Sequence, residues 1–363
     1  MNLSRVERVL DNLADMGLDQ AIICDPMAIF WLSGYRNDPY ERFFALLVAR
    51  DREPVMFCNR LFPDATPFCD RVVVFDDTED PIPMVARELD ATKPAGVDKN
   101  LAARWLLPLM DAQAAAAFRL ASDAVDGARS IKDARELDLM RAASATNDRA
   151  MEWLASQVRA GVTERQIAEG LLSTYRRLGA EGHSFPPIVS FGANASDPHH
   201  EPDDTVLEPG ELVLFDVGCM RDSYASDMTR TFWYAGPDDV EPTPEFRKIY
   251  EVVRAANEAA EKIVRPGVEF AEIDRAARSV IADAGYGEYF THRLGHQIGL
   301  EDHEPGDVSS AHHEPVRPGQ TFSIEPGIYL PGGIGVRIED LVIVTEDGCE
   351  VINSYPEQLT VLR

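Results

Sequence analysis

Four carboxylates interrupt apolar, strand-like runs in the second half of the chain, where apolar side chains would be expected. Asp216 follows four apolar residues in "LVLFDVG", Glu325 lies in "FSIEPGIY", and Glu339 lies in "VRIEDLVIV". Asp227 comes eleven positions after Asp216, in the next expected strand. Because an unpaired carboxylate inside a protein is very costly, each of these side chains needs a partner of opposite charge.

Two simple structural explanations are open for these acids. Asp216 could cap the end of a strand or pair with Arg230. Arg337 shares a strand face with Glu339, because side chains alternate along a strand, and the two could form a structural pair. Neither explanation accounts for all four carboxylates.

A metal site accounts for all four. Carboxylates packed together repel and raise one another's pKa values unless cations neutralise them. Two divalent ions balance the charge of four carboxylates, and a histidine completes a ligand set that favours Mn²⁺, Co²⁺ or Zn²⁺ over Cu(I) or an iron–sulfur cluster. Two such ions about 3.5–4 Å apart activate water at neutral pH and stabilise a tetrahedral intermediate. The pattern therefore predicts a hydrolase with a dinuclear site.

A histidine-rich segment, "HRLGHQIGLEDHE", holds three of the chain's eight histidines. His292 and His296 are four positions apart and would share a helix face, as in the H-E-x-x-H zinc motif. However, Arg293 stands where that motif has its glutamate, and Gly295 and Gly299 disfavour a helix. The segment is therefore expected to have an irregular backbone, in which each histidine has a separate role.

The pattern of apolar residues predicts two domains. Helices expected near 1–16, 82–91 and 101–119 alternate with short apolar runs, which predicts a small α/β domain over residues 1–127. In residues 128–363 an arrangement of two helices followed by strands occurs twice, which predicts an α+β domain. The helices expected there cover 130–158, 163–179, 243–264 and 272–285, and the last two expected strands cover 320–330 and 335–345.

The charge and the cysteines limit where the protein acts. With 62 acidic and 35 basic residues, the formal net charge is −27. Such a surface repels phosphate backbones and anionic lipid, so neither nucleic acid nor a membrane is expected as a partner. The N-terminal segment has no apolar signal core. The five cysteines lack C-x-x-C spacing, as in reduced proteins, so we expect a cytoplasmic protein.

Four motifs, in chain order, carry a family resemblance. "FDVGCMRDSYASDMTRT", "HRLGHQIGLEDHE", "SIEPGIY" and "VRIEDLVIV" resemble the metallopeptidases of the pita-bread fold, and are most similar to Xaa-Pro dipeptidases (prolidases) and aminopeptidase P. "WLSGY" and "SIKDARELDLMRAA" extend the resemblance over the full length. The resemblance implies a pita-bread (creatinase/aminopeptidase) catalytic domain over residues 128–363, behind a smaller α/β creatinase-like domain over residues 1–127.

The resemblance also implies a ligand set. Asp216 would chelate one ion, Asp227 and Glu339 would bridge both, and His296 and Glu325 would bind the other. Two divalent ions per subunit are expected, with Mn²⁺ the first choice and Co²⁺ or Zn²⁺ the alternatives.

Further roles are implied for residues around the ions. Glu325 would take the proton of the bridging water, and His303 would hydrogen-bond the scissile carbonyl or the developing oxyanion. His292 would shape the proline side of the pocket. His199 would assist the leaving amine, with His200 beside it as a weaker candidate.

Four more residues receive an expectation. Arg337 and Tyr329 match positions that orient ligands and the oxyanion. His312 and His313 match no family position and are expected in a solvated loop.

The predicted reaction is hydrolysis of the Xaa-Pro bond at the N-terminus of dipeptides or short peptides, by a homodimer. Two departures from the family matter: Gln297 replaces a glycine, and Asp307 lies where many dipeptidases have an arginine for the substrate's carboxylate. Arg317, Arg293 or an arginine of the N-terminal domain could bind the substrate's carboxylate in place of that arginine.

Aminopeptidase P activity on longer peptides is the main alternative. A metal-dependent lyase and a catalytically silent binding module are weaker ones, and methionine aminopeptidases and metal-free creatinase-type hydrolases fit less well.

Overall fold

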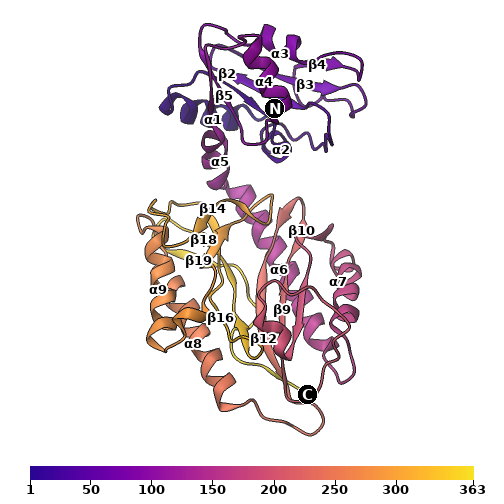
Figure 1. Ribbon diagram of the computed structural model, residues 1–363, viewed down its shortest axis with the longest axis vertical. Helices are drawn as coiled ribbons and strands as arrows, with labels where there is room; N and C mark the ends of the chain where they lie inside the picture. Colours follow the sequence, from indigo (N-terminus) through magenta and orange to yellow (C-terminus); the bar gives the residue numbers. More distant parts are fainter. The chain divides into compact units, whose positions relative to one another are not determined.

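The chain folds into two compact units, Met1–Arg129 and Ser130–Arg363. The computed structural model describes all residues from Met1 to Arg363, and Figure 1 shows the elements of each unit. None of the helices combines the length and the apolar character that crossing a bilayer requires.

The N-terminal unit is built on one six-stranded mixed sheet with the order β4-β3-β2-β1-β5-β6. Strand β1 is antiparallel to β2 and parallel to β5. The strands are β1 (Gln20–Ile23), β2 (Ala45–Ala49), β3 (Arg52–Asn59), β4 (Arg71–Phe75), β5 (Pro94–Val97) and β6 (Ala117–Leu120). The helices are α1 (Leu3–Asp15), α2 (Pro26–Ser33), α3 (Ile82–Glu88), α4 (Ala103–Asp111) and α5 (Ser122–Ser130).

The helix expected over 101–119 is wrong in its second half. Helix α4 ends at Asp111, Gln113 adopts a left-handed conformation with φ 49°, and β6 follows. Strand β6 pairs in parallel with β5 along its whole length. The backbone hydrogen bonds of a sheet therefore override the helix preference of this alanine-rich segment.

Helix α2 lies where no helix is predicted. Its sequence, "PMAIFWLS", is apolar on all sides, so it lacks the amphipathic period by which a helix is recognised. The side chain of Asp25 accepts a hydrogen bond from the backbone N–H of Met27 and caps the helix N-terminus. Most of the helix is buried.

Four long helices flank the strands of the C-terminal unit. They are α6 (Ala134–Gln157), α7 (Glu164–Leu178), α8 (Pro244–Glu261) and α9 (Phe270–Asp283). Helices α6 and α7 pack together against β7–β11, and α8 and α9 pack together against β14–β17, so the strands lie between two helix pairs (Figure 1). The capping box expected between Thr163 and Gln166 is present at the start of α7.

The strands of this unit form two larger sheets, β20-β12-β9-β8 and β14-β13-β15-β18-β19, and two small ones, β11-β10-β7 and β16-β17. In chain order the strands are β7 (Gly182–His183), β8 (Ile188–Phe191), β9 (Glu211–Val217), β10 (Cys219–Arg221), β11 (Tyr224–Ala225), β12 (Met228–Tyr234), β13 (Gly295–Gln297), β14 (Glu304–Val308), β15 (Thr321–Ile324), β16 (Gly327–Tyr329), β17 (Gly335–Arg337), β18 (Asp340–Val344), β19 (Cys349–Val351) and β20 (Val361–Leu362).

The two strands expected over 320–330 and 335–345 are each broken in the middle. Glu325 follows β15 and Glu339 precedes β18, so both acids lie in gaps between strands and not inside them. Their backbone N–H groups donate to Leu294 O (2.8 Å) and Thr229 O (3.1 Å). The breaks thus keep the backbone hydrogen-bonded while the carboxylates leave the strand ladder.

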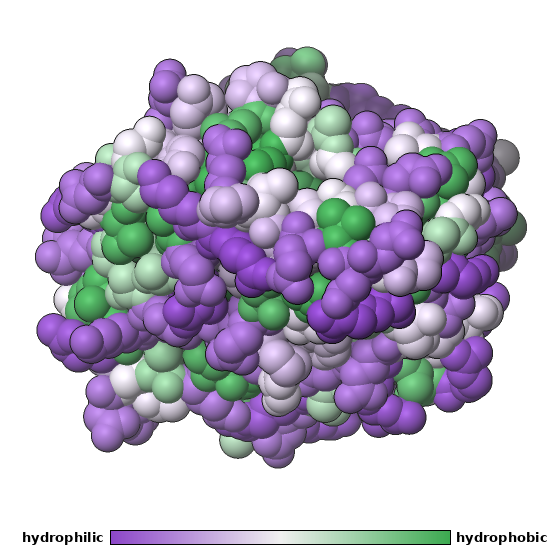
Figure 2. All heavy atoms as spheres, turned by 90° about the horizontal axis from the view of Figure 1, so that it is seen from below, coloured by the Kyte–Doolittle hydropathy of each residue, from purple (hydrophilic) through white to green (hydrophobic).

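The surface shown in Figure 2 is mostly hydrophilic, with apolar residues scattered among polar ones. This agrees with the formal net charge of −27. The apolar residues are concentrated inside, where separate clusters lie beneath α8–α9 and beneath α6–α7.

Candidate functional site

Two pairs of antiparallel strands bring the four acids to matching strand ends. In the β9–β12 pair, Val217 lies opposite Met228, so Asp216 and Asp227 are each one residue from that position. In the β15–β18 pair, Ile324 lies opposite Asp340, so Glu325 and Glu339 come from the same end of that pair. Each sheet therefore contributes two carboxylates.

Thr229 connects the two pairs. Its hydroxyl donates a hydrogen bond to Glu339 Oε2 (2.7 Å), and its carbonyl accepts from the backbone N–H of Glu339. Because Thr229 lies on β12, directly after the segment that carries Asp227, these bonds hold the two acids in a common site.

His296 lies beside the carboxylates on β13. Its Nε2 is 3.6 Å from an oxygen of Asp227 and 3.6 Å from an oxygen of Glu325. Its Nδ1 is 3.2 Å from the backbone carbonyl of Gln297, so a proton on Nδ1 leaves Nε2 as a free electron donor. Burial lowers the pKa of His296 to about 3, which keeps the ring neutral at pH 7.

The backbone must approach closely at this strand. A Cβ at Gly295, the residue before His296, would lie 1.9 Å from the carbonyl oxygen of Ser323. No other residue fits this position without moving β13 away from β15.

Several buried oxygens of these acids have no hydrogen-bond partner. They are Asp216 Oδ1, Asp227 Oδ1 and Glu339 Oε1. Ligand atoms of Asp227, His296 and Glu339 all lie within 4.8 Å of one another. Buried carboxylate oxygens without partners, beside a free imidazole nitrogen, are suited to divalent metal ions.

The raised pKa values of three of these acids also indicate that cations are needed to keep the carboxylates ionised. Burial, together with repulsion from Glu339, raises the pKa of Asp227 well above its ordinary range, and burial with repulsion from Glu325 does the same for Glu339. Burial raises the pKa of Glu325 to about 8. Divalent cations at this position would stabilise the ionised carboxylates.

Arg337 pairs with Asp216, and not with Glu339. Its Nη2 lies 2.5 Å from Asp216 Oδ2, its Nη1 donates to Tyr329 Oη (2.8 Å), and its Nε donates to Thr229 Oγ1 (3.0 Å). The simple pairing of Arg337 with Glu339 is therefore wrong.

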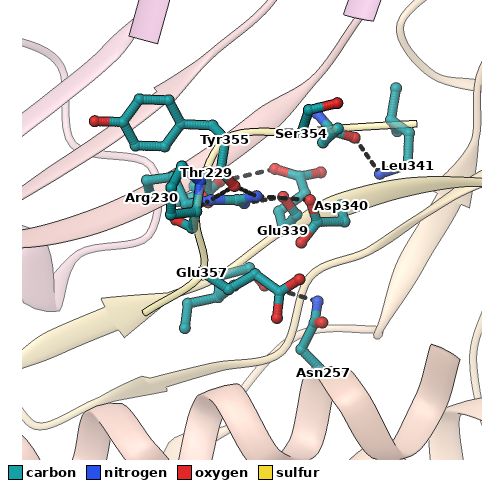
Figure 3. Close-up of polar contacts among 12 residues, drawn as sticks. Thr229, Arg230, Asn257, Glu339, Asp340, Leu341, Ser354, Tyr355 and Glu357 are labelled. Atoms are coloured by element: carbon teal, nitrogen blue, oxygen red, sulfur yellow. Dashed lines mark hydrogen bonds and ion pairs between the residues drawn. The ribbon is translucent and has the colours of Figure 1, made fainter. Parts of the chain in front are cut away.

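Arg230 pairs with Asp340, which excludes its pairing with Asp216. The Arg230 guanidinium lies 2.7 Å from Asp340 Oδ1 and also donates to the backbone carbonyls of Thr229, Glu339 and Tyr355 (Figure 3). Since Asp340 follows Glu339 directly, this contact fixes the backbone on which Glu339 is carried.

All five predicted ligands face one cavity of about 830 Å³. The apolar residues that line it include Pro186, Pro187 and Ile188. The other polar residues that line it include His199, His200, His292, Arg293, Asp302, His303 and Arg337. Among the arginines considered for a substrate carboxylate, Arg293 lines this cavity and Arg317 does not.

His292 and His303 both line the cavity but contact different residues. His292 is half-buried, with Nε2 2.9 Å from Tyr329 Oη, and burial lowers its pKa to about 4. The His303 ring lies with its centroid 3.8 Å from that of His296, and 60% of its side chain is exposed. The three histidines of this segment thus have different neighbours, and the separate roles expected for them stay a prediction.

The two neighbouring histidines of the loop before β9 have different surroundings. His199 is exposed at the cavity edge, and its backbone N–H is bound by Asp197. His200 Nε2 lies 2.7 Å from the carboxylate of Glu164, which is fully buried and also binds the backbone N–H of Phe191. His200 thus anchors the loop that carries His199.

The expectation of a solvated loop holds for His313 but is wrong for His312. His313 is exposed. The His312 ring stacks on Phe270 with centroids 4.4 Å apart, and its Nδ1 is 2.6 Å from Asp307 O. The residues next to His312 in the sequence do not encode its contact with an aromatic ring from a distant helix, so the solvated-loop expectation missed this contact.

Asp302 is a cavity residue that the sequence analysis missed. Its carboxyl group lies within hydrogen-bonding reach of Asp227, and burial, together with repulsion from Asp216, raises its pKa to about 7. In a chain with 62 acidic residues, one more aspartate beside a histidine carries no signal of its own.

Two family models match most of the chain. Residues 138–346 match the metallopeptidase family M24, and residues 5–131 match the creatinase/prolidase N-terminal domain. An uncharacterised peptidase of Staphylococcus aureus strain MSSA476 is 36% identical over 356 residues, which are 97% of this chain and 99% of the relative.

Two solved structures share the whole fold. The dipeptidase PepE of Mycobacterium ulcerans has a TM-score of 0.92 and 34% identity, over 99% of this chain and 97% of that one. The Xaa-Pro dipeptidase of Bacillus anthracis has a TM-score of 0.90 and 29% identity, over 99% of both chains. These matches confirm the expected pita-bread domain with a creatinase-like N-terminal domain.

Proposed function

Because this chain belongs to metallopeptidase family M24, we propose that it is an Xaa-Pro dipeptidase that uses two divalent metal ions, with Mn²⁺ as the working metal. The observation that carries the proposal is the set of buried carboxylate oxygens without partners beside the free Nε2 of His296. The Xaa-Pro dipeptidase of Bacillus anthracis, which shares the fold, supports the substrate class.

The proposed ligands are Asp216, Asp227, His296, Glu325 and Glu339. When bound, the ions would supply an activated water and a positive field for developing negative charge. Arg337 would hold Asp216 in place, and Thr229 would orient Glu339 through its hydroxyl.

The remaining groups would handle the substrate. Glu325 would accept a proton from the attacking water, and His303 would donate a hydrogen bond to the scissile carbonyl oxygen. His199, at the cavity edge, would deliver a proton to the leaving nitrogen. His292, held by Tyr329 and neutral at pH 7, would pack against the proline ring.

Proline-containing substrates suit such a site. An Xaa-Pro amide has no N–H to donate, and the ring fixes φ. Hydrolysis here requires only a polarised carbonyl and a proton source for the nitrogen. The acidic groups around the ligands would also attract the substrate's free α-amine, which would explain cleavage at the N-terminus.

The main alternative is aminopeptidase P activity on longer peptides. It is favoured by one departure from the family: by the resemblance, Asp307 stands where many dipeptidases have an arginine for the substrate's carboxylate. We propose that Arg293, which lines the cavity, takes this role instead. We also propose a cytoplasmic homodimer, in keeping with five free cysteines and with the resemblance to the family.

The test compares Ala-Pro, Ala-Pro amide and Ala-Pro-Pro on chelator-stripped protein supplied with Mn²⁺, following alanine release. A dipeptidase would cleave Ala-Pro best, and Arg293→Met would raise KM for Ala-Pro more than for its amide. Efficient cleavage of Ala-Pro-Pro would assign the protein to aminopeptidase P. No cleavage of any substrate, with two ions bound, would exclude the peptidase and favour a lyase.

A further inference from the structure

Asp302 places an additional carboxylate in the candidate metal site. It lies between β13 and β14, lines the cavity, and has only 15% of its side chain exposed. Its Oδ1 is buried and has no hydrogen-bond partner. Asp216, Asp227 and Glu339 likewise each have a buried carboxylate oxygen without a hydrogen-bond partner.

The nearest charged groups give Asp302 no counter-ion among the protein's own side chains. Its carboxyl group lies within hydrogen-bonding reach of another acid, Asp227. Its Oδ2 is 3.5 Å from Nε2 of His303, which is too long for a strong hydrogen bond. Two neighbouring buried carboxylates are stable in their ionised forms only when a cation lies close to both.

Counting the charges in the site shows what the carboxylate of Asp302 would add. Asp216 is already paired with Arg337, so one of the four predicted carboxylates is neutralised by the protein itself. Asp227, Glu325 and Glu339 then carry three negative charges, whereas two divalent ions carry four positive ones. Asp302 supplies the missing charge.

We propose that Asp302 is a fifth carboxylate of the metal site, which acts beside Asp227 to increase the affinity for the second divalent ion. The proposal rests on the proposed two-ion site but not on the peptide substrate. It differs from a role for Asp302 in orienting His303, which would alter turnover and leave metal affinity unchanged.

The experiment titrates chelator-stripped protein with MnCl₂ by isothermal titration calorimetry. Wild type is expected to bind two ions per chain. Asp302→Asn keeps the shape but removes the charge, and is expected to bind one ion roughly 10–100-fold more weakly. Asp307→Asn is the matched control, because it removes an acid from the adjacent strand β14 that does not line the cavity. It should bind both ions as wild type does.

A second variant separates charge from folding. Asp302→Glu keeps the charge and is expected to bind the second ion more tightly than Asp302→Asn. Circular dichroism and the rise of Tm with added MnCl₂ are measured for each variant. If Asp302→Asn does not fold, Asp302→Ser takes its place: a smaller Tm rise than in Asp302→Glu supports the proposal, and a rise equal to that of wild type overturns it.

The outcomes separate this proposal from the proposed function. Wild-type affinity for both ions in Asp302→Asn overturns the role of Asp302, even if Ala-Pro is cleaved. A wild type that binds two ions without cleaving any Xaa-Pro peptide overturns the substrate assignment alone. A wild type that binds fewer than two ions overturns both.

Discussion

The guanidinium of Arg230 lies 2.7 Å from the carboxylate of Asp340, and only 2% and 0% of the two side chains are exposed. The pair joins β12 to β18, which belong to different sheets. Asp227 directly precedes β12 and Glu339 directly precedes β18, so the pair connects the two elements that carry the proposed bridging ligands. Figure 3 shows Arg230 between Asp340 and Tyr355, with Glu357 nearby.

Replacing Arg230 with Met is expected to lower the free energy of unfolding by roughly 3–5 kcal/mol, because it leaves Asp340 as an unpaired buried charge. Urea denaturation measures the change. Arg247→Met is the control, since its partner Glu241 is exposed and such a pair contributes only about 0–1 kcal/mol. Equal losses for the two variants would contradict the buried-pair argument.

Replacing His303 with Ala is expected to lower kcat for Ala-Pro roughly 10²–10³-fold, because the variant loses the donor proposed for the scissile carbonyl. Folding should be retained, since His303 is largely exposed. His313→Ala, an exposed histidine that does not line the cavity, should keep wild-type kcat. A kcat close to that of wild type in His303→Ala would remove the residue from the mechanism.

Replacing Gly306 with Ala is expected to destabilise the fold for two reasons. Its φ is +115°, and a Cβ would lie 2.5 Å from Nε2 of Gln297. Gly332→Ala is the control: its φ is +66° but nothing lies within 4 Å, so only backbone strain of about 1–2 kcal/mol is expected. In urea denaturation, Gly306→Ala should lower the free energy of unfolding more than Gly332→Ala does. Adding Gln297→Gly to Gly306→Ala should recover the part of this loss that comes from the steric clash. If the two alanine variants lose the same amount, Gln297 does not crowd this position.

Glu261 gives the fold a pH dependence. Burial, with repulsion from Asp340 and Glu357, raises its pKa from 4.5 to about 8. The folded state therefore binds this proton more tightly than the unfolded chain does. The resulting stabilisation is complete below pH 4.5 and is lost as the pH rises to about 8.

The side chain at position 261 stays neutral in Glu261→Gln. The free energy of unfolding should therefore fall between pH 5 and pH 8 by roughly 2–4 kcal/mol less in this variant than in wild type. Urea denaturation across this range provides the measurement. Glu258→Gln, on the same helix but exposed and paired with Arg254, removes only a minor one of the charges that raise the pKa of Glu261, so its pH profile should stay close to that of wild type. Parallel profiles for wild type and Glu261→Gln would show that Glu261 ionises normally.

Local features of the sequence determined much of the fold and the identity of the candidate ligands. Helix α7 begins after the capping box of Thr163 and Gln166, because a cap is formed by residues only three positions apart. The four acids in apolar runs indicated a polar site in a buried region, since burial follows from the surrounding apolar residues. The order of the motifs was sufficient to indicate the family.

The tertiary structure decided which charges meet. Arg337 and Asp216 are 121 positions apart, and Arg230 and Asp340 are 110 apart. The alanine-rich segment around Ala117 became a strand because β5 was available to pair with it. Asp302 lines the cavity only because the loop between β13 and β14 brings it to Asp227. An ion pair depends on which strands pack together, and the spacing of residues along one strand does not contain that information.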